Sequence, residues 1–163
     1  MATTTGTATV TLPSETEILI TREFDAPRRL VWQAWTTPDL VRRWWAGQRG
    51  EVTEAEIDLR VGGRWRYVMI ARGGHEVAFH GEFREIVPEE RLVNTEVYEG
   101  VPVAAEDEPV NVVTFTESGG RTKLELLTRT TSRELRDMII GSGMETGMQE
   151  SMDALEQVAV SLR

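Results

Sequence analysis

The chain has 163 residues, of which 40% are hydrophobic and 28% are charged, a size and composition typical of one globular domain. Its formal net charge of −9 argues against a nucleic-acid-binding surface, because phosphate contacts need clustered Lys and Arg. The absence of cysteine excludes disulfides, thiolate catalysis and zinc–sulfur sites, and it fits a cytoplasmic protein.

The first residues are expected to be a leader, not part of the fold. Residues 1–14 are rich in Thr and lack the basic and apolar regions of a secretory signal, so we predict a flexible leader there. A single domain is expected at 15–163. Its apolar runs are too short to span a bilayer, so no membrane span is expected.

A strand and two short helices are predicted to open the domain. Residues 17–24 alternate as a strand, with Ile18, Ile20 and Arg22 on one face. The first helix is expected over Pro27–Trp35, with Pro27 at its first position, where no N–H is needed. The second is expected over Asp39–Trp44, with Thr37 as its cap.

Alternating segments bounded by Gly and Pro predict a run of strands. With the first strand they make a sheet of about seven. The segments are Glu51–Leu59, Arg64–Ala71, Glu76–Ile86, Arg91–Tyr98, Val110–Thr116 and Arg121–Thr128.

For the hairpin between the third and fourth strands, we predict the register that keeps the apolar residues on one face. A three-residue loop at Gly73–His75 does so, whereas a two-residue loop sets aromatic residues opposite polar ones. This register leaves room at Gly81 beside the Tyr67 ring. The predicted pairs are Trp65 with Phe83, Tyr67 with Gly81, and Met69 with Phe79.

Two registers are open for the strand at residues 91–98. In one, Leu92 faces inward and brings the polar side chains of Asn94, Glu96 and Tyr98 with it. In the other, Val93, Thr95 and Val97 face inward and Glu96 is solvated. Because charged residues are seldom buried without a partner, we favour the second register.

A long amphipathic helix is predicted to close the chain. Thr131-Ser132-Arg133-Glu134 indicates a capping box at its start. Gly141 and Gly143 weaken the helix, so we expect either one bent helix or a short helix followed by a long one. The apolar stripe contains Ile140, Gly141, Met144, Met148, Ser151, Met152, Leu155, Val158, Ala159 and Leu162.

Four ordered motifs resemble one known family, named after the activator of the heat-shock protein 90 ATPase, within the START-like, birch-pollen-allergen-like superfamily (polyketide cyclase/dehydrase and lipid transport). The motifs are Ile20–Trp45, Asp58–Trp65, Gly81–Leu92 and Ser142–Met148. The resemblance covers residues 17–163. It implies an α+β helix-grip fold, in which a curved antiparallel sheet is crossed by the long C-terminal helix.

The superfamily includes lipid and hormone carriers, polyketide cyclases, aromatase components and co-chaperone domains, so the shared fold does not fix one activity. Two positions depart from the usual pattern of the family, where aromatic residues are common. This chain has Met148 near the start of the terminal helix and Asn94 on a strand. Both departures imply a softer or more polar pocket.

Aromatic and Met side chains are candidates for the lining of a ligand cavity, because such walls bind flat or greasy molecules. The alternative is that they are packed core. The candidates are Trp35, Trp44, Trp45, Trp65, Tyr67, Met69, Phe79, Phe83, Tyr98, Phe115, Met144, Met148 and Met152, with Asn94 and Glu96 as polar cavity residues.

No metal site, cofactor or catalytic cluster is expected. His75 is predicted in a turn and His80 on the face opposite Phe79, and no His-x-x-x-His pattern exists. Ser142 lacks the strand–turn–helix context of a nucleophile elbow.

Three functions are therefore considered, and binding is favoured over catalysis. The first is binding of a small hydrophobic or aromatic molecule between the sheet and the terminal helix. The second is a co-chaperone-like module that stimulates a heat-shock protein 90-type ATPase. The third is a cyclase- or hydratase-like enzyme using Glu96, Tyr67 or Tyr98 as acid or base. Self-association as a homodimer would protect exposed strand edges.

Overall fold

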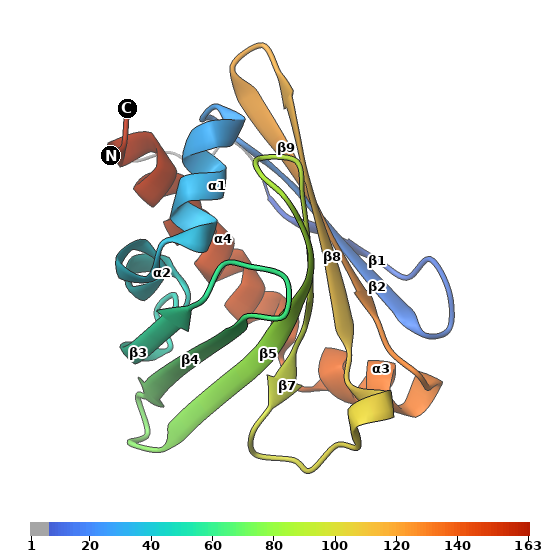
Figure 1. Ribbon diagram of the computed structural model, residues 1–163. Coiled ribbons are helices and arrows are strands. Elements are labelled where there is room, and N and C mark those ends of the chain that lie inside the picture. The colour runs from blue at the N-terminus through green and yellow to red at the C-terminus, as the bar shows by residue number, and fades with distance from the viewer. Residues whose placement is uncertain (1–6) are drawn as a thin grey trace.

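The computed structural model describes residues 7–163, so the first six residues of the expected leader lie outside the described residues. Within this part, the chain forms one antiparallel sheet and four α-helices, whose arrangement can be followed in Figure 1. The strands are β1 (Thr9–Thr11), β2 (Glu17–Phe24), β3 (Gly50–Ile57), β4 (Arg64–Ala71), β5 (Glu76–Val87), β6 (Arg91–Thr95), β7 (Val97–Tyr98), β8 (Val110–Ser118) and β9 (Arg121–Arg129). The helices are α1 (Arg28–Thr36), α2 (Pro38–Trp44), α3 (Arg133–Gly141) and α4 (Met144–Ser161), with a short 3-10 helix η1 (Ala105–Asp107).

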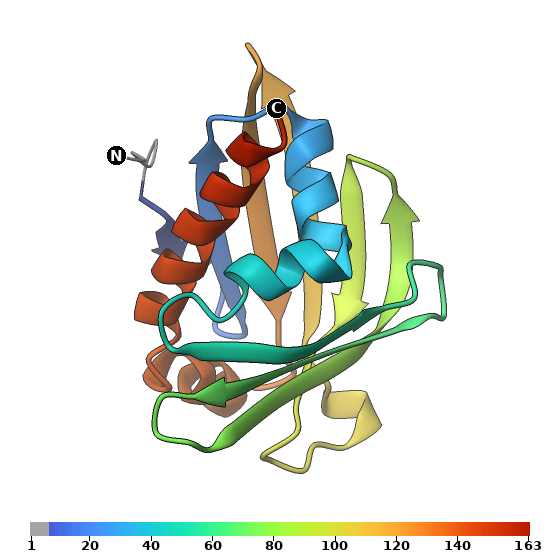
Figure 2. The same ribbon diagram turned by 90° about the vertical axis from the view of Figure 1, so that its left-hand side faces the viewer.

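The strands lie in the order β1-β2-β9-β8-β6-β5-β4-β3, and β7 also pairs with β5. The sheet is strongly curved. Figure 2 shows α4 and α1 in front of β2, β9 and β8, while β3, β4 and β5 cross below α2. The predicted α+β helix-grip fold is therefore confirmed, with a curved antiparallel sheet crossed by a long C-terminal helix.

The sheet has more strands than the seven expected from the sequence. Thr9–Thr11, inside the predicted leader, pairs with β2 as an edge strand. The strand predicted at residues 91–98 divides after Thr95 into β6 and β7, which pair with different parts of β5. None of the helices in residues 7–163 has the length and apolar character that a membrane crossing requires.

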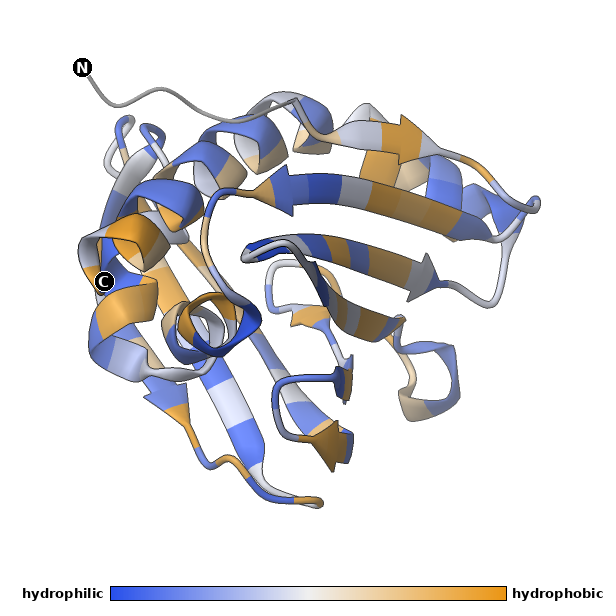
Figure 3. Cartoon of the chain, turned by 90° about the horizontal axis from the view of Figure 1, so that it is seen from above, coloured by the Kyte–Doolittle hydropathy of each residue, from blue (hydrophilic) through white to orange (hydrophobic). Residues whose placement is uncertain are grey.

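The core lies between the inner face of the sheet and the helices α1 and α4. The predicted alternation of β2 is confirmed, since Ile18, Ile20 and even Arg22 are buried on this face. Trp32 of α1 packs edge-on against Phe115 of β8, with ring centroids 5.4 Å apart. Hydrophobic segments, orange in Figure 3, occur on the helices and along the strands that enclose this core.

The β4–β5 hairpin differs from the predicted register by two residues. Trp65 pairs with Gly81, Tyr67 with Phe79, and Met69 with Val77. The three-residue loop is Arg72–Gly74, one residue earlier than predicted, because Gly74 takes the positive φ (89°) of the last loop position. The apolar residues still share one face. However, Gly81 makes room for Trp65 instead of Tyr67.

The C-terminal segment is two helices, which decides between the two forms that the sequence left open. α3 ends at Gly141 and α4 begins at Met144, with Gly143 at φ 83° between them. The helix cap differs from the predicted box. Ser132 Oγ accepts from the Leu135 amide at 3.1 Å, so Ser132 is the N-cap. The Thr131 hydroxyl instead donates to Asp107.

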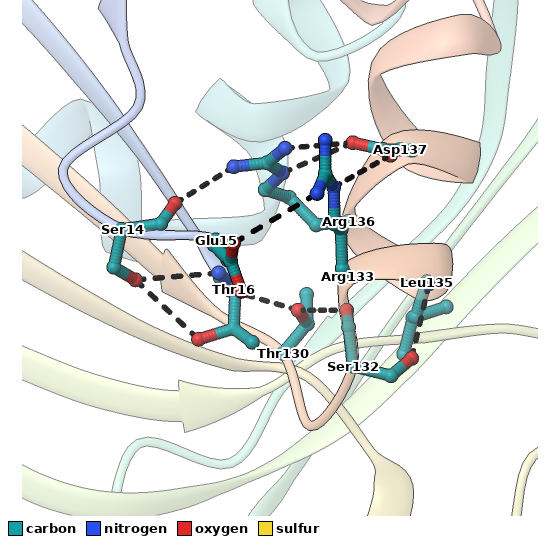
Figure 4. A network of polar contacts seen from close by, with 9 residues as sticks. All are labelled: Ser14, Glu15, Thr16, Thr130, Ser132, Arg133, Leu135, Arg136 and Asp137. Carbon is teal, nitrogen blue, oxygen red and sulfur yellow. Dashed lines mark hydrogen bonds and ion pairs between the residues drawn. The ribbon is translucent and has the colours of Figure 1, made fainter.

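A polar network fastens the start of α3 to the turn between β1 and β2 (Figure 4). The Arg136 guanidinium donates to the Ser14 carbonyl at 2.7 Å and pairs with Asp137. The Thr130 hydroxyl donates to the Thr16 carbonyl, also at 2.7 Å. Because Arg136 and Thr130 are buried, these bonds are shielded from water, and they hold α3 against this end of the sheet.

Candidate functional site

Six of the predicted cavity residues are packed core, each at most 6% exposed. The indole N–H of Trp44 donates to Ala34 O at 2.9 Å, and that of Trp65 donates to Thr95 O at 3.1 Å. Because their indole N–H groups are already hydrogen-bonded inside the protein, these two rings belong to the packed core. The six residues are Trp44, Trp65, Met69, Phe83, Phe115 and Met152.

The other aromatic candidates keep part of their surface accessible. Trp45 lies edge-on to Tyr67 and to Phe79, with centroids 5.5 and 5.7 Å apart, and all three rings are partly exposed. Tyr98 packs on Phe79 at 5.2 Å but is 42% exposed, which places it at a rim. Trp35 instead stacks on Trp44, at the place where α1 meets α2.

Packing on the inner face loosens toward the α3 end of the molecule. Along β9, Leu124 is fully buried, whereas Leu126 on the same face is partly exposed. Along α4, Met152 is 3% exposed, whereas Met148 and Met144, one and two turns earlier, are partly exposed. Because β9 leads into α3 and α4 follows it, both trends point to the same end (Figure 1).

A row of polar side chains crosses the inner face at this end. Asn94, Asn111 and Thr128 are paired neighbours on β6, β8 and β9. The Thr128 hydroxyl donates to Asn111 Oδ1 at 2.8 Å, and Asn111 Nδ2 donates to Glu96 Oε1 at 2.6 Å. Asn94 Nδ2 donates to Thr95 O at 3.0 Å. The row therefore ends on the carboxyl group of Glu96.

The register favoured from the sequence for this segment is wrong. Leu92 and Asn94 face inward, and Glu96 is partly buried where the polar row meets it. The hydroxyl of Thr95 points to the other side, where it accepts from the Glu82 amide at 2.9 Å. Burying a carboxyl group generally costs free energy, and this argument favoured the wrong register. Here the hydrogen bond from the Asn111 amide offsets that cost, so Glu96 can face inward.

The surroundings of Glu96 and Tyr67 favour the neutral, protonated form of each side chain. Burial raises the pKa of Glu96, while the hydrogen bond from Asn111 opposes that shift. Burial also raises the pKa of the Tyr67 phenol, and a charge on Glu96 raises it further. A carboxyl group with a raised pKa beside a phenol can donate or accept protons near neutral pH.

The outer face carries a different polar cluster. His80 points away from the inner face, as predicted, and its Nδ1 lies 2.9 Å from Glu99 Oε2. Arg66 pairs with Glu99 and with Glu54, and its hydrogen bonds, followed by that of His80, lower the pKa of Glu99 to about 2. Arg66, His80 and Glu99 border an open cleft of about 620 Å³.

This outer cleft is a poorer candidate than the inner region, because the charge of Arg66 is already neutralised by two carboxylates. In residues 7–163, no group of three His, Cys, Asp or Glu side chains could hold a metal ion. We therefore place the candidate site on the inner face. We define it as the inner site: Trp45, Tyr67, Phe79, Glu96, Asn111, Leu126, Thr128 and Met148.

Three of these residues, Asn111, Leu126 and Thr128, were missed as site candidates from the sequence. A usable signal was present, since alternation from Phe115 back to Asn111, and from Leu124 on to Thr128, puts polar residues on the core face. Their meeting with Glu96 depends on the pairing of β6 with β8. These are residues from separate segments, and no local pattern brings them together.

Comparison with known proteins agrees with this architecture. A family model described as activator of Hsp90 ATPase homolog 1-like protein matches residues 25–159, most of the chain. No curated protein matches the chain.

Solved structures share the fold over almost the whole chain. A protein from Rhodobacter sphaeroides is similar at a TM-score of 0.87 and 24% identity, over 96% of this chain and 99% of that one. A protein from Arthrobacter aurescens has a TM-score of 0.82 and 25% identity, over 94% and 91%. An AHSA1-like protein from Aeromonas hydrophila has 0.63 and 23%, over 88% and 93%.

Proposed function

The chain belongs to the activator of Hsp90 ATPase homolog 1-like family, and from this membership and the inner-face geometry we propose that it binds a small hydrophobic or aromatic molecule between its sheet and α4. The START-like fold of this family commonly binds hydrophobic ligands. The ligand lies against Trp45, Tyr67 and Phe79 on one side and against Leu126 and Met148 on the other.

One observation carries the proposal: apolar side chains of the inner face stay accessible beside fully buried neighbours. Leu126 follows buried Leu124 on the same face of β9, and Met148 precedes buried Met152 on α4. Apolar surface left in contact with water costs about 25 cal/mol per Å². A bound apolar molecule that covers these side chains recovers that free energy.

The test is titration with the uncharged probe N-phenyl-1-naphthylamine, followed by tryptophan fluorescence. Trp45 contacts the site, so binding should quench its emission with a saturable curve. Leu126→Trp should abolish the quenching, because the larger ring fills the site. Leu127→Trp is the matched control, since Leu127 is the next residue of β9 and faces the other side of the sheet.

Two results would contradict binding at this place. One is linear, unsaturable quenching in the wild-type protein. The other is equal affinity in the Leu126→Trp and wild-type proteins while both remain folded by near-ultraviolet circular dichroism.

A second candidate, an acid–base enzyme, is favoured by the inward position of Glu96. A carboxyl group with a raised pKa can remove or donate a proton next to a carbonyl. Exchange of the α-protons of 2-acetylnaphthalene with deuterium from the solvent, measured by NMR, tests this activity. Glu96→Gln should abolish the exchange, whereas Glu56→Gln on the outer face should leave it unchanged.

The co-chaperone function stays a prediction that rests on the family resemblance. Co-purification with a heat-shock protein 90-type chaperone and stimulation of its ATPase must both be observed to support it. Homodimer formation and a cytoplasmic location likewise stay predictions. The cysteine-free composition supports the location.

A further inference from the structure

Glu96 carries a carboxyl group on an aromatic and apolar face, and no cation of residues 7–163 contributes to its pKa shift. Within the described residues, its environment consists of burial and the hydrogen bond from Asn111. Arg22, a basic side chain of the inner face, is already paired with Asp153 and Glu156. Burial disfavours the charged carboxylate and raises the pKa of Glu96, which favours the neutral acid.

The direction of the hydrogen bonds determines which oxygen carries the proton. Thr128 donates to Asn111, and Asn111 in turn donates to Oε1 of Glu96. Oε1 therefore acts as the acceptor, and the proton of the neutral acid is carried on Oε2. The polar row holds the carboxyl group in place and presents its O–H as a donor.

Tyr67 supplies a second neutral O–H in the same region. Its ring is held by Trp45 and Trp65, with centroids 5.5 and 4.8 Å away. In the described part of the chain, its hydroxyl makes no hydrogen bond to another side chain or to the backbone, and the side chain is partly exposed. It is close enough to Glu96 to respond to a charge there.

We propose that the inner site selects an uncharged apolar molecule with a carbonyl oxygen, which accepts a hydrogen bond from the carboxyl group of Glu96 and a second from Tyr67. This inference rests on the proposed function and names the class of ligand. A carbonyl oxygen has two lone pairs and no proton, so it matches two O–H donors. A buried donor that stays unpaired costs free energy, so the site disfavours a pure hydrocarbon.

The same arrangement rejects carboxylate ligands. A negative charge on the ligand would be buried next to the Glu96 carboxyl group, whose pKa is shifted, within residues 7–163, by burial and by the Asn111 hydrogen bond. Glu96→Gln should preserve the selection, because the amide of Gln has the same shape and still offers an N–H donor. Glu96→Met should reduce it, since Met has similar length but no hydrogen-bond donor and only Tyr67 then remains to donate.

The experiment compares three probes of nearly the same shape by isothermal titration calorimetry. They are 2-acetylnaphthalene, its isostere 2-isopropenylnaphthalene, in which CH₂ replaces the carbonyl oxygen, and 2-naphthoate. The wild-type protein should bind the ketone at least about fivefold more tightly than the isostere, the value of one net hydrogen bond. It should bind 2-naphthoate most weakly of the three.

Matched variants locate the donor. Glu96→Met should prefer the ketone less than wild type does, because only Tyr67 still donates, while its affinity for the isostere stays within about twofold of wild type. Tyr67→Phe should reduce the preference in part. Glu56→Met, an acidic residue of the outer face, is the control and should keep the full preference.

Infrared spectroscopy supplies a readout that does not depend on affinity. The carbonyl stretch of the bound ketone should lie at lower wavenumber in the wild-type complex than in the Glu96→Met complex. Should Glu96→Met fail to fold, a lower wavenumber in the wild-type complex than in the Glu96→Gln complex supports the proposal, because the acid is the stronger donor. Equal wavenumbers overturn it.

The outcomes separate the two proposals. Equal binding of ketone and isostere by the wild-type protein overturns the selection by Glu96 but leaves hydrophobic binding intact. A preference that is as large in Glu96→Met as in wild type also overturns it. No binding of either neutral probe overturns the proposed function and this inference together.

Discussion

Arg22 of β2 donates a hydrogen bond of 2.8 Å to Asp153 of α4, and this contact joins the inner face of the sheet to the helix that crosses it. A second carboxylate, Glu156, lies 3.6 Å from the guanidinium and is itself buried. The Arg22 side chain is fully shielded and sits 4.8 Å over the Phe24 ring. The position of α4, and with it one wall of the inner site, depends on this contact.

Replacing Arg22 with Met should lower the free energy of unfolding by about 3–5 kcal/mol, because it leaves a carboxylate buried without its cation. Urea denaturation followed by circular dichroism measures the loss. Arg129→Met is the control, since Arg129 pairs with Glu17 at an exposed position and such pairs contribute about 1 kcal/mol or less. Equal losses in the two variants would contradict the assigned role of Arg22.

Gly81→Ala should destabilise the protein by about 3 kcal/mol or more. A Cβ at this position would overlap the Thr95 carbonyl oxygen and the Trp65 indole nitrogen, which form a hydrogen bond with each other. Gly141→Ala is the matched substitution at an open position in a helix, and it should stabilise the protein by roughly 0.5–1 kcal/mol. Thermal unfolding of both variants checks the opposite signs. A tolerated Gly81→Ala would show that Trp65 is not packed against this glycine.

The pKa of Glu96 predicts how stability depends on pH. Burial raises this pKa above the ordinary value of 4.5, so the folded protein holds the proton more tightly than the unfolded chain. Its contribution to stability is complete below pH 4.5 and is lost as the pH rises through the raised pKa, by at most about 1.4 kcal/mol per pH unit.

Glu96→Gln should therefore be more stable than wild type at neutral pH, and the difference should disappear toward pH 4. Urea denaturation at several pH values measures the difference in free energy of unfolding between the two proteins. The contributions of the other titrating groups cancel in this difference. A variant that is less stable than wild type at neutral pH would contradict the neutral-acid assignment.

Ser132→Ala should cost about 1 kcal/mol, because it removes the side chain that caps α3. Thr131→Ala should cost less, since the exposed hydroxyl of Thr131 bonds only to a neighbouring side chain, Asp107. Equal costs, or a larger cost for Thr131→Ala, would favour the cap predicted from the sequence pattern. Thermal unfolding distinguishes these results.

Local patterns were sufficient for most of the elements, and the family resemblance implied the fold class. The alternation in residues 17–24 correctly put the charged Arg22 on the core face, although its partners Asp153 and Glu156 lie far away in the sequence. The glycines at 141 and 143 correctly indicated a break in the terminal helix. These features follow from backbone geometry within a few residues, so they can be predicted without the rest of the molecule.

Registers were less predictable. The requirement that Trp65, Tyr67 and Met69 share one face identified the correct face of β4. A register shift of two residues leaves every side chain on its face, so this requirement could not detect the shift. The positive φ of Gly74 fits the last position of the true loop, a position that the predicted loop would have given to His75. Periodicity alone cannot separate such alternatives.

The sequence by itself determined the order of most strands and helices, the family and an aromatic, apolar inner face. Only the tertiary structure decided that Glu96 faces that interior. Its inward position depends on Asn111 and Thr128, which reach it through the pairing of β6, β8 and β9. Whether a carboxyl group can be buried depends on the partners that the fold brings to it, and strand pairing across distant segments determines those partners.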